Sequence, residues 1–349
     1  PFCAAKRRRL GGGCVGTSCV TTEIVVTRRK AHAMADSWYN RRIMRVQPRG
    51  HLAAIFTIFI WGITFISIKV LLEDFSPIEA MFYRQVVALA ALVVITLPAV
   101  FRKKPAAQQA APADLKAVRQ RELLFMAAGL TGVTLYFIFQ NTALDYTQAS
   151  NVGVLISVAP LFTALVSALF LRTEKLGVGF FVGFGIAILG IVLISYTGST
   201  TLQLNPLGDL LSLMAAGVWA FYSVSVRKLS EAGVPALRIT QKAFFYGLLF
   251  LLPVLPLFGF RLGLERLADL SNILHILFLG LGASALCFIT WNYAVSVLGP
   301  VRTSVYIYMT PVITIAASAL LLDEQITPVS ALGVALILVG LFVSERQKR

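Results

Sequence analysis

The feature that most limits what this 349-residue chain can fold into is a series of ten stretches without formal charge. Each has at least 17 residues, and a helix rising about 1.5 Å per residue crosses a bilayer with roughly 17 to 25 residues. Only 13% of the residues are charged, too few to cover ten buried apolar helices with polar surface. We therefore predict an all-α, polytopic membrane protein with ten transmembrane helices. The stretches are 52–68, 85–101, 123–144, 146–171, 176–208, 210–226, 243–260, 270–301, 303–322 and 325–344.

Basic residues predict the direction of threading. The net charge is +15, but lysine and arginine lie in the N-terminal tail and the short connections, so we expect no nucleic-acid partner. With the N-terminus inside, 20 basic residues fall in the inner connections and four on the outer side, namely Lys69, Arg84, Arg261 and Arg266. By the positive-inside rule both termini face the cytoplasm, and we expect the membrane to be a bacterial inner (plasma) membrane.

Residues 1–50 form a basic tail that we expect to be disordered or mis-started. The tail is rich in arginine and its only acidic residues are Glu23 and Asp36. Two interpretations remain open. An organellar transit peptide has this character, whereas an extended reading frame would place the true start at Met34 or Met44. In either case the tail is excluded from the predicted fold.

The sequence carries no motif of a metal, cofactor or enzyme site. Its four cysteines form no C-x-x-C pair and no Cys/His spacing typical of zinc. HExxH and Walker A motifs are absent from the sequence. Asp145 and Asp209 do not have the setting of an intramembrane aspartyl protease, and Ser284 and His275 are a poor nucleophile–base pair. We expect no cofactor, no metal and no enzymatic activity.

The two halves of the sequence repeat each other. A shift of 158 residues places Trp61 on Trp219, Lys69 on Arg227, Pro77 on Pro235 and Arg84 on Lys242. Shifts of 151 and 150 residues place Asn141 on Asn292, Pro160 on Pro311, Gly183 on Gly333 and Gly190 on Gly340. We therefore predict two five-helix repeats, residues 51–197 and 208–344, followed by a cytoplasmic tail of residues 345–349.

An odd number of helices per repeat has a mechanical consequence. The second repeat must enter the membrane from the side opposite to the first, so the two repeats have inverted topology. Two such halves meet at the bilayer midplane, and exchanging their shapes converts an inward-open cavity into an outward-open one. The predicted architecture is therefore typical of alternating access.

Two sets of residues resemble a known family. The pattern W-x7-[K/R]-x7-P-x6-[R/K], which begins at Trp61 and again at Trp219, is similar to the opening motif of the EamA family of the drug/metabolite transporter superfamily. So are NTALDYTQASNVGVLISVAPLFTALV and its second copy NYAVSVLGPVRTSVYIYMTPVITIAA. The resemblance covers about residues 51–344. It implies two five-helix repeats, a central cavity and export or exchange of small metabolites, often amino acids. Ala220 in place of a second glycine and Lys242 in place of arginine depart from strict symmetry of the halves.

Basic residues and prolines are candidates for gating. Lys69, Arg84, Arg227 and Lys242 lie near predicted helix ends, where they either line the cavity mouth and attract a carboxylate or extend to the lipid headgroups. Lys69 with Glu73 and Arg84 with Glu79 are candidate local ion pairs. Pro160 and Pro311 interrupt helices four and nine, either as bends that move during transport or as static kinks.

Amide and aromatic side chains are candidates for solute binding. Asn141 and Asn292 lie within predicted spans and either bind solute or join helices by hydrogen bonds. The aromatic candidates are Trp61, Tyr136, Trp219, Tyr222, Tyr306 and Tyr308. An interfacial belt is the alternative for any of these aromatic residues. Because Tyr306 and Tyr308 are two positions apart on a helix, we expect at most one of them to face solute.

Four glycines at seven-residue spacing indicate packing rather than chemistry. Gly183 and Gly190, and their counterparts Gly333 and Gly340, predict closely packed helices. Gly179 and Gly183 also form a GxxxG motif, which makes a homodimer a candidate assembly.

These observations together predict a secondary transporter in the lipid bilayer. We expect it to export or exchange a small polar metabolite, an amino acid or a related solute, because the predicted lining is aromatic and amide with basic mouths. Uptake or exchange of another metabolite or drug is an alternative, as is a channel or receptor without catalysis.

Overall fold

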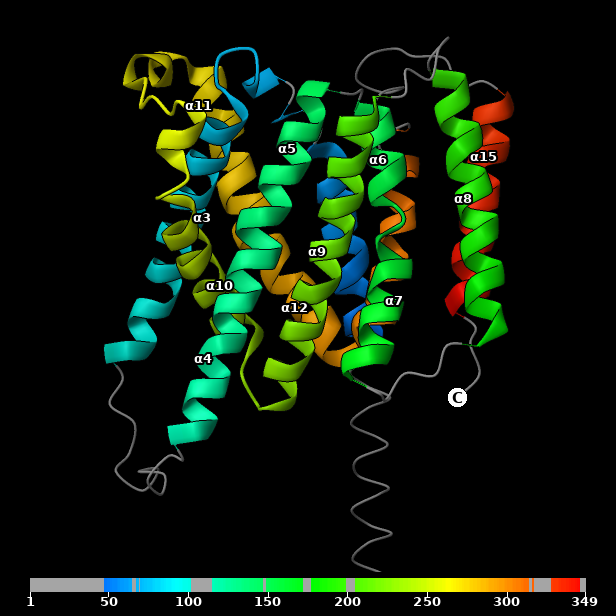
Figure 1. Ribbon diagram of the computed structural model, residues 1–349, viewed down its shortest axis with the longest axis horizontal. Helices are drawn as coiled ribbons and strands as arrows, with labels where there is room; N and C mark the ends of the chain where they lie inside the picture. The colour runs from blue at the N-terminus through cyan, green and yellow to red at the C-terminus, as the bar shows by residue number, and fades with distance from the viewer. Residues whose placement is uncertain are drawn as a thin grey trace, which may run out of the picture. The chain divides into compact units, whose positions relative to one another are not determined.

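Figure 1 shows a computed structural model of the chain, which divides into two units, Pro1–Pro48 and Arg49–Arg349. The predicted tail up to residue 46, Lys69 and residues 346–349 lie outside the described residues, so the expectations for them remain predictions. The structure describes residues 47–64, 67–68, 70–101, 115–146, 149–171, 177–198, 205–313, 316 and 328–345.

The described part of the second unit is built from helices, and no strand occurs in it. The first helix of this unit comprises residues 49–64. The α-helices that follow are α3 (Pro77–Phe101), α4 (Leu115–Gly129), α5 (Tyr136–Tyr146), α6 (Ala149–Ile156), α7 (Ala159–Phe170), α8 (Val178–Gly198), α9 (Pro206–Glu231), α10 (Ala236–Leu251), α11 (Leu270–Leu277), α12 (Cys287–Leu298), α13 (Pro300–Val305) and α15 (Pro328–Glu345). Wider π-helical turns form η2 (Leu130–Leu135) and η5 (Phe278–Leu286), and tighter 3₁₀ turns form η3 (Leu255–Phe258), η4 (Leu264–Ala268) and η6 (Tyr306–Tyr308).

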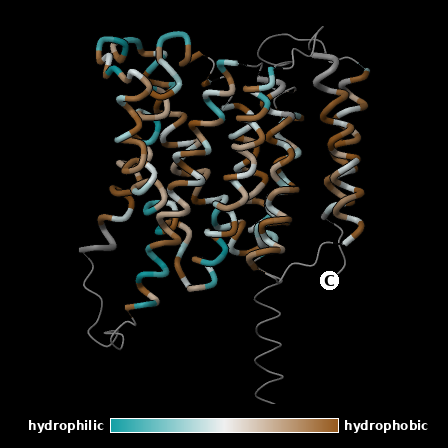
Figure 2. The backbone as a smooth tube through the Cα atoms, in the orientation of Figure 1, coloured by the Kyte–Doolittle hydropathy of each residue, from teal (hydrophilic) through white to brown (hydrophobic). Residues whose placement is uncertain are grey.

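The helices have the length and surface of membrane spans. In the described part, Pro77–Leu97, Leu115–Tyr146, Pro206–Glu231 and Leu270–Leu298 are long and apolar enough to cross a bilayer. Figure 2 shows that the helices are hydrophobic along much of their length. Many large apolar side chains on these spans and on the shorter helices are exposed. Leu169 on α7 is 69% exposed and Val178 on α8 is 80% exposed, which suits contact with lipid chains. The prediction of an all-α, integral membrane protein is confirmed.

α3 begins earlier than its charge-free stretch predicts. The Glu79 carboxylate accepts a hydrogen bond from the Ser76 backbone N–H at 2.9 Å, and proline occupies the first helical position. This is half of a capping box followed by the proline that helix starts favour. The helix therefore begins at Pro77 instead of residue 85, and Arg84 lies two turns inside it. The prediction that Arg84 belongs to the outer connection is wrong, because local capping extends the helix past two charged residues.

Two helical irregularities recur at matching places. The π-helical η2 separates α4 from α5, and the π-helical η5 separates α11 from α12. A turn at residues 157–158 separates α6 from α7, and η6 separates α13 from the helical residues 309–313. In both cases the places correspond under the shift of about 151 residues that relates Asn141 to Asn292. In Figure 1, α4 lies below α5 whereas α11 lies above α12, so these two corresponding rods run in opposite directions.

α8 and α15 pack against each other through the predicted glycines. A Cβ atom at Gly190 would lie 2.5 Å from the Gly333 carbonyl oxygen, and one at Gly340 would lie 2.6 Å from the Gly183 carbonyl oxygen. Only glycine allows the two backbones to approach this closely. The prediction that these glycines serve helix packing is confirmed. Gly183 of the GxxxG motif is used within the chain, because its Cβ would meet the backbone of α15.

Candidate functional site

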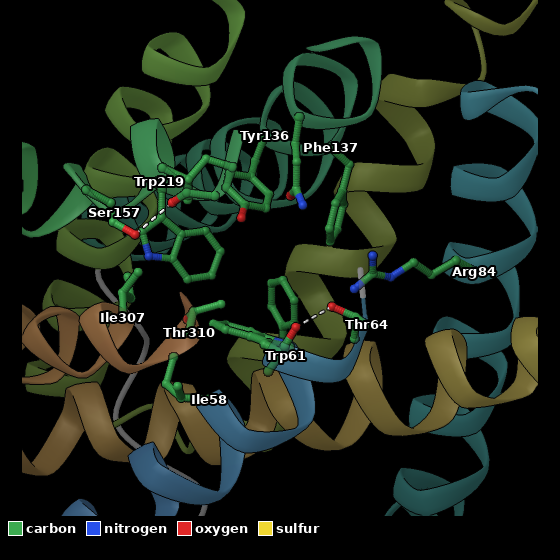
Figure 3. Close-up of a pocket in the computed structure, with 15 residues that line it drawn as sticks. Ile58, Trp61, Thr64, Arg84, Tyr136, Phe137, Ser157, Trp219, Ile307 and Thr310 are labelled. Carbon is green, nitrogen blue, oxygen red and sulfur yellow. Dashed lines mark hydrogen bonds between the residues drawn. The ribbon is translucent and has the colours of Figure 1, made fainter. Parts of the chain in front are cut away.

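A cavity that is partly open to solvent lies among helix 49–64, α3, α5, α6, α7, α9, α12 and residues 307–310 (Figure 3). Its empty space, including the part open to solvent, is about 650 Å³. Aromatic side chains form much of its wall, and a few polar groups project between them. The aromatic lining residues are Trp61, Tyr136, Phe137, Trp219 and Phe288. The polar ones are Thr64, Arg84, Gln140, Ser157 and Thr310, and the aliphatic and small ones are Ile58, Gly153, Ile156, Ala159 and Ile307.

Arg84 carries the single charge among the described residues that line the cavity. Its side chain is buried, and its Nε donates a hydrogen bond to the Ser284 Oγ at 2.5 Å. The guanidinium carbon lies 4.2 Å from the centroid of the Phe137 ring, a cation–π arrangement. Figure 3 shows the guanidinium directed toward the space between Thr64 and Phe137. Within the part of the chain that the structure describes, no carboxylate bonds to Arg84.

Three predicted aromatic residues lie on the cavity wall. The centroid of the Trp219 ring is 4.9 Å from that of Tyr136 and 5.4 Å from that of Trp61. Trp61 is held in place because its Nε1 donates to the Ala283 carbonyl oxygen at 2.9 Å. Trp291 extends this cluster, with its ring centroid 5.1 Å from that of Trp61. The rings of the wall therefore pack against one another, and such aromatic contacts fix the positions of these side chains.

Two polar atoms of the lining lack partners within the described residues. Trp219 Nε1 is a donor and Gln140 Oε1 is an acceptor, and both are buried without a hydrogen bond. Buried polar atoms normally find a partner because an unpaired one costs about 1–3 kcal/mol. Open space continues past Gly153, where an added Cβ would meet no atom within 4 Å. The lining can therefore accept a ligand that brings hydrogen-bonding groups of its own.

Tyr222 and Asn292 lie outside the cavity and form a closed network. The Tyr222 hydroxyl donates to the Asn292 Oδ1 at 2.7 Å, and the Asn292 Nδ2 donates to the Thr240 Oγ1 at 2.9 Å. All three residues are completely buried. The network joins α9, α10 and α12. Asn292 therefore joins helices by hydrogen bonds in this structure, which is the second of the two interpretations that the sequence left open.

Asn141 sits in a weaker setting than Asn292. Its Nδ2 donates to the Pro77 carbonyl oxygen at 3.4 Å, which joins α5 to the start of α3. Its Oδ1 is buried and has no partner among the described residues. Asn141 does not line the cavity, although the preceding residue, Gln140, does.

Tyr306 and Tyr308 are buried away from the cavity, on either side of the lining residue Ile307. The Tyr306 hydroxyl lies 2.6 Å from the His51 Nδ1. Tyr308 packs in a cluster with Phe184 on α8, their ring centroids 6.4 Å apart. The two tyrosines do point to different neighbours, as their spacing predicts.

The basic candidates other than Arg84 form contacts away from the cavity. Arg227 bonds to Glu231 at 2.8 Å and to the Ser296 carbonyl oxygen at 2.9 Å. Lys242 pairs with Glu122, and its ammonium nitrogen is 4.6 Å from the Phe125 ring centroid.

The expected pair of Arg84 with Glu79 does not form. Glu79 instead binds the Arg266 guanidinium at 2.9 Å and the Arg261 backbone N–H at 3.0 Å. Arg84 points inward from the same helix, toward Ser284. The hydrogen bond that Arg266 donates to the Glu79 carboxylate raises the pKa of Arg266, so this guanidinium keeps its charge. The cluster ties the start of α3 to the connection between α10 and α11.

The two prolines follow the helix interruptions. Pro160 is buried near the start of α7, directly after the turn at residues 157–158, where Ser157 Oγ donates to the Gly153 carbonyl oxygen at 2.7 Å. Pro311 follows η6 within the helical residues 309–313. Lining residues of the cavity, Ser157 and Thr310, sit at both interruptions.

Sequence reasoning missed several lining residues. Gln140 could have been found, because it precedes Asn141 in QNTAL and two adjacent amides in an apolar span are unusual. Phe137 and Phe288 are two of 24 phenylalanines, and no pattern distinguishes them from lipid-facing ones. Gly153 lines the cavity through the absence of a side chain, which only neighbouring helices can reveal.

Comparison with known proteins identifies relatives over most of the chain. Residues 48–196 and 206–345 each match the EamA-like transporter family. An uncharacterized transporter of Archaeoglobus fulgidus is 29% identical over 293 residues, which are 84% of this chain and 97% of that protein. A probable terminal-alkyne amino-acid exporter of Streptantibioticus cattleyicolor is 27% identical over 84% of this chain and 93% of that protein. A probable amino-acid metabolite efflux pump of Escherichia coli is 25% identical over 83% of this chain and 93% of that protein.

A solved crystal structure shares the fold. Its TM-score is 0.65 at 19% sequence identity, and the similarity covers 85% of this chain and 96% of that one.

Proposed function

This chain belongs to the EamA-like transporter family, and from that premise we propose that it exports or exchanges an amino acid or a related small metabolite. Two relatives named for amino-acid export support the solute class. The observation that carries the proposal is the cavity itself, in which a buried guanidinium that has no carboxylate partner among the described residues faces a wall of aromatic rings. Such a lining offers one point for an anionic group and apolar surface for the rest of a small organic solute.

The proposed mechanism is alternating access of two inverted five-helix repeats, residues 51–197 and 208–344, around that cavity. The family matches the chain twice, at residues 48–196 and 206–345. The opposite directions of α4–α5 and α11–α12, and the paired interruptions at η2 and η5, support an inverted relation. We place ten transmembrane helices in the protein, with both termini in the cytoplasm of a bacterial inner membrane, because the basic residues are so strongly one-sided.

The corresponding asparagines support two halves that exchange shapes. Asn292 has both polar groups paired, whereas Asn141 has one long bond and an oxygen without a partner among the residues that the structure describes. In an alternating mechanism the two repeats adopt different shapes at any one time. We infer that the opposite state pairs Asn141 more completely and opens the network around Asn292.

Efflux from proteoliposomes tests the transport function. The full chain, purified and reconstituted, should release radiolabelled amino acids faster than empty vesicles do. Unlabelled solute on the far side should accelerate the release, because an alternating carrier returns faster when loaded. Release without such acceleration would indicate a channel, and no release across a broad panel of amino acids and their derivatives would reject the proposal.

Truncating the cavity wall provides the matched comparison. Trp219→Ala removes a lining ring from α9 and should lower flux by about tenfold or more, since a buried aromatic contact contributes on the order of 1.4 kcal/mol or more to binding. Phe221→Ala, on the same helix, removes a ring that is 44% exposed and faces away from the cavity. Flux should remain within about twofold in that control. Equal flux from both variants would contradict a role for this cavity.

A further inference from the structure

We propose that the cavity selects monocarboxylates that lack a free ammonium group, in preference to zwitterionic amino acids. The class comprises carboxylic acids with an aromatic or aliphatic body in which the amino group is acylated or replaced. This inference rests on the proposed function and narrows its solute. It follows from the charges of the cavity, the geometry of Arg84 and the two unpaired atoms of the lining.

The charge of the cavity is unbalanced. Arg84 is the one charged side chain among the described lining residues. The Glu79 carboxylate on the same helix forms an ion pair with Arg266, and the Glu122 carboxylate on α4 forms one with Lys242, so neither pairs with Arg84. A buried cation is costly unless an anion pairs with it. A solute carboxylate would supply that anion from within the cavity.

The geometry of Arg84 leaves donors for such a carboxylate. Its Nε donates to the Ser284 hydroxyl and one face of its guanidinium packs on the Phe137 ring, so these two contacts fix the position of the side chain. Its two terminal nitrogens have no hydrogen-bond partner in the described part of the chain. A guanidinium binds a carboxylate with two parallel hydrogen bonds when two N–H groups are available. The arrangement is therefore preorganised for one carboxylate.

An ammonium group finds no equivalent partner. In an α-amino acid the ammonium lies next to the carboxylate, so binding at Arg84 would bring two cations together. No carboxylate lines the cavity among the described residues, and neutral oxygens compensate poorly for a lost hydration shell. Ring faces attract an ammonium group, but repulsion from the adjacent guanidinium opposes that attraction. The free ammonium of a zwitterion is therefore disfavoured in this cavity.

A neutral amide matches the unpaired atoms better. Gln140 Oε1 can accept from an amide N–H, and Trp219 Nε1 can donate to an amide carbonyl. An acylated amino group offers both of these groups and carries no charge. The rings of Trp61, Tyr136 and Phe288 then cover the apolar body of the solute.

Four ligands that share the 3-phenylpropanoyl unit test the proposal. They are N-acetyl-phenylalanine and 3-phenylpropanoate as anions, phenylalanine as zwitterion, and phenylalanine amide as cation. Binding to the purified full chain is measured by thermal shift and calorimetry, and flux is measured in proteoliposomes. Both anions should bind at least about tenfold more tightly than phenylalanine, and the cation most weakly. Phenylalanine binding as tightly as the two anions would overturn the proposal.

Substitution of Arg84 supplies the second arm. Arg84→Gln should lower the affinity for both anions by about tenfold or more and abolish their advantage over phenylalanine, whereas Arg84→Lys should retain part of that advantage. Arg119→Gln, at an exposed position on α4, is the matched control and should leave the ranking unchanged. If Arg84→Gln does not fold, the wild-type ranking decides. An unchanged ranking in folded Arg84→Gln would also overturn the proposal.

The two levels of the hypothesis fail differently. Amino-acid flux without any preference for the anions would overturn the selection proposed here and leave the transport function standing. Absence of both binding and flux for the four ligands, together with absence of flux across the broader panel, would overturn both.

Discussion

At the scale of single residues, two equivalent asparagines have acquired different surroundings. Asn292 donates to Thr240 and accepts from Tyr222, and all three side chains are completely buried. Asn141 makes one bond of 3.4 Å, and its oxygen remains unpaired in the described part of the chain. Their places in the repeat are the same, so the difference arises from the helices that face them.

This difference predicts unequal costs of substitution. Asn292→Leu removes two hydrogen bonds and leaves the buried Tyr222 hydroxyl without its partner, whereas Thr240 keeps its bond to the Ala236 carbonyl oxygen. The substitution should therefore destabilise the protein by about 1–3 kcal/mol. Asn141→Leu removes one weak bond and an unpaired oxygen, and should cost less than about 1 kcal/mol. Thermal unfolding in detergent, followed by the loss of the monodisperse peak, measures both. Equal losses would mean that the network around Asn292 contributes little.

Residue identity alone identified only part of the cavity. Trp61, Tyr136 and Trp219 were predicted to contact solute and do line it, and Arg84 lines it although it was expected at a mouth. Tyr222 and Tyr308 have the same chemistry as Tyr136 but face neighbouring helices. The type of side chain can be read from the sequence, whereas the direction in which it points depends on how each helix is rotated.

At the scale of elements, glycine spacing determines how one helix pair packs. α8 and α15 approach so closely that a Cβ at Gly190 would overlap the Gly333 carbonyl oxygen and Ile337. Close approach of this kind replaces the hydrophobic effect, which is absent between helices in lipid, by van der Waals contact. The seven-residue spacing of glycines in both helices therefore predicts the face through which they pack.

Alanine substitutions within α8 separate close packing from helix propensity. Gly190→Ala places a methyl group 2.5 Å from the Gly333 carbonyl oxygen and should destabilise the protein by about 1–3 kcal/mol through overpacking. Gly185→Ala, on the same helix, meets no atom within 4 Å and should be neutral or stabilise by up to about 1 kcal/mol. The two melting temperatures in detergent test this, and a neutral Gly190→Ala would exclude the close contact.

At the scale of the whole molecule, the arrangement of two similar halves sets the expected topology. α4–α5 and α11–α12 carry π-helical turns at corresponding places and run in opposite directions. The connection before α3 and the connection before α10 should therefore face opposite sides of the bilayer. Both connections have exposed residues at which this can be tested.

Cysteine labelling measures that topology. Glu73→Cys and Ala232→Cys introduce thiols at exposed positions in the two corresponding connections, in a background where Cys3, Cys14 and Cys19 are replaced. Cys287 is buried and can remain. A membrane-impermeant maleimide added to intact cells should label position 73 and reach position 232 only after permeabilisation. Labelling of both positions from one side would refute the inverted arrangement.

The sequence by itself determined that this is a helical membrane protein of a transporter family, and which helices pack through glycine. Those properties depend on local composition and spacing, which are written along the chain. The tertiary structure alone decided that Arg84 and Phe288 line the cavity. It also decided that both polar groups of Asn292 form hydrogen bonds, with Tyr222 and Thr240, away from the cavity. The physical reason is that lipid is as apolar as the protein interior, so a membrane helix lacks the polar stripe that would show which face points inward.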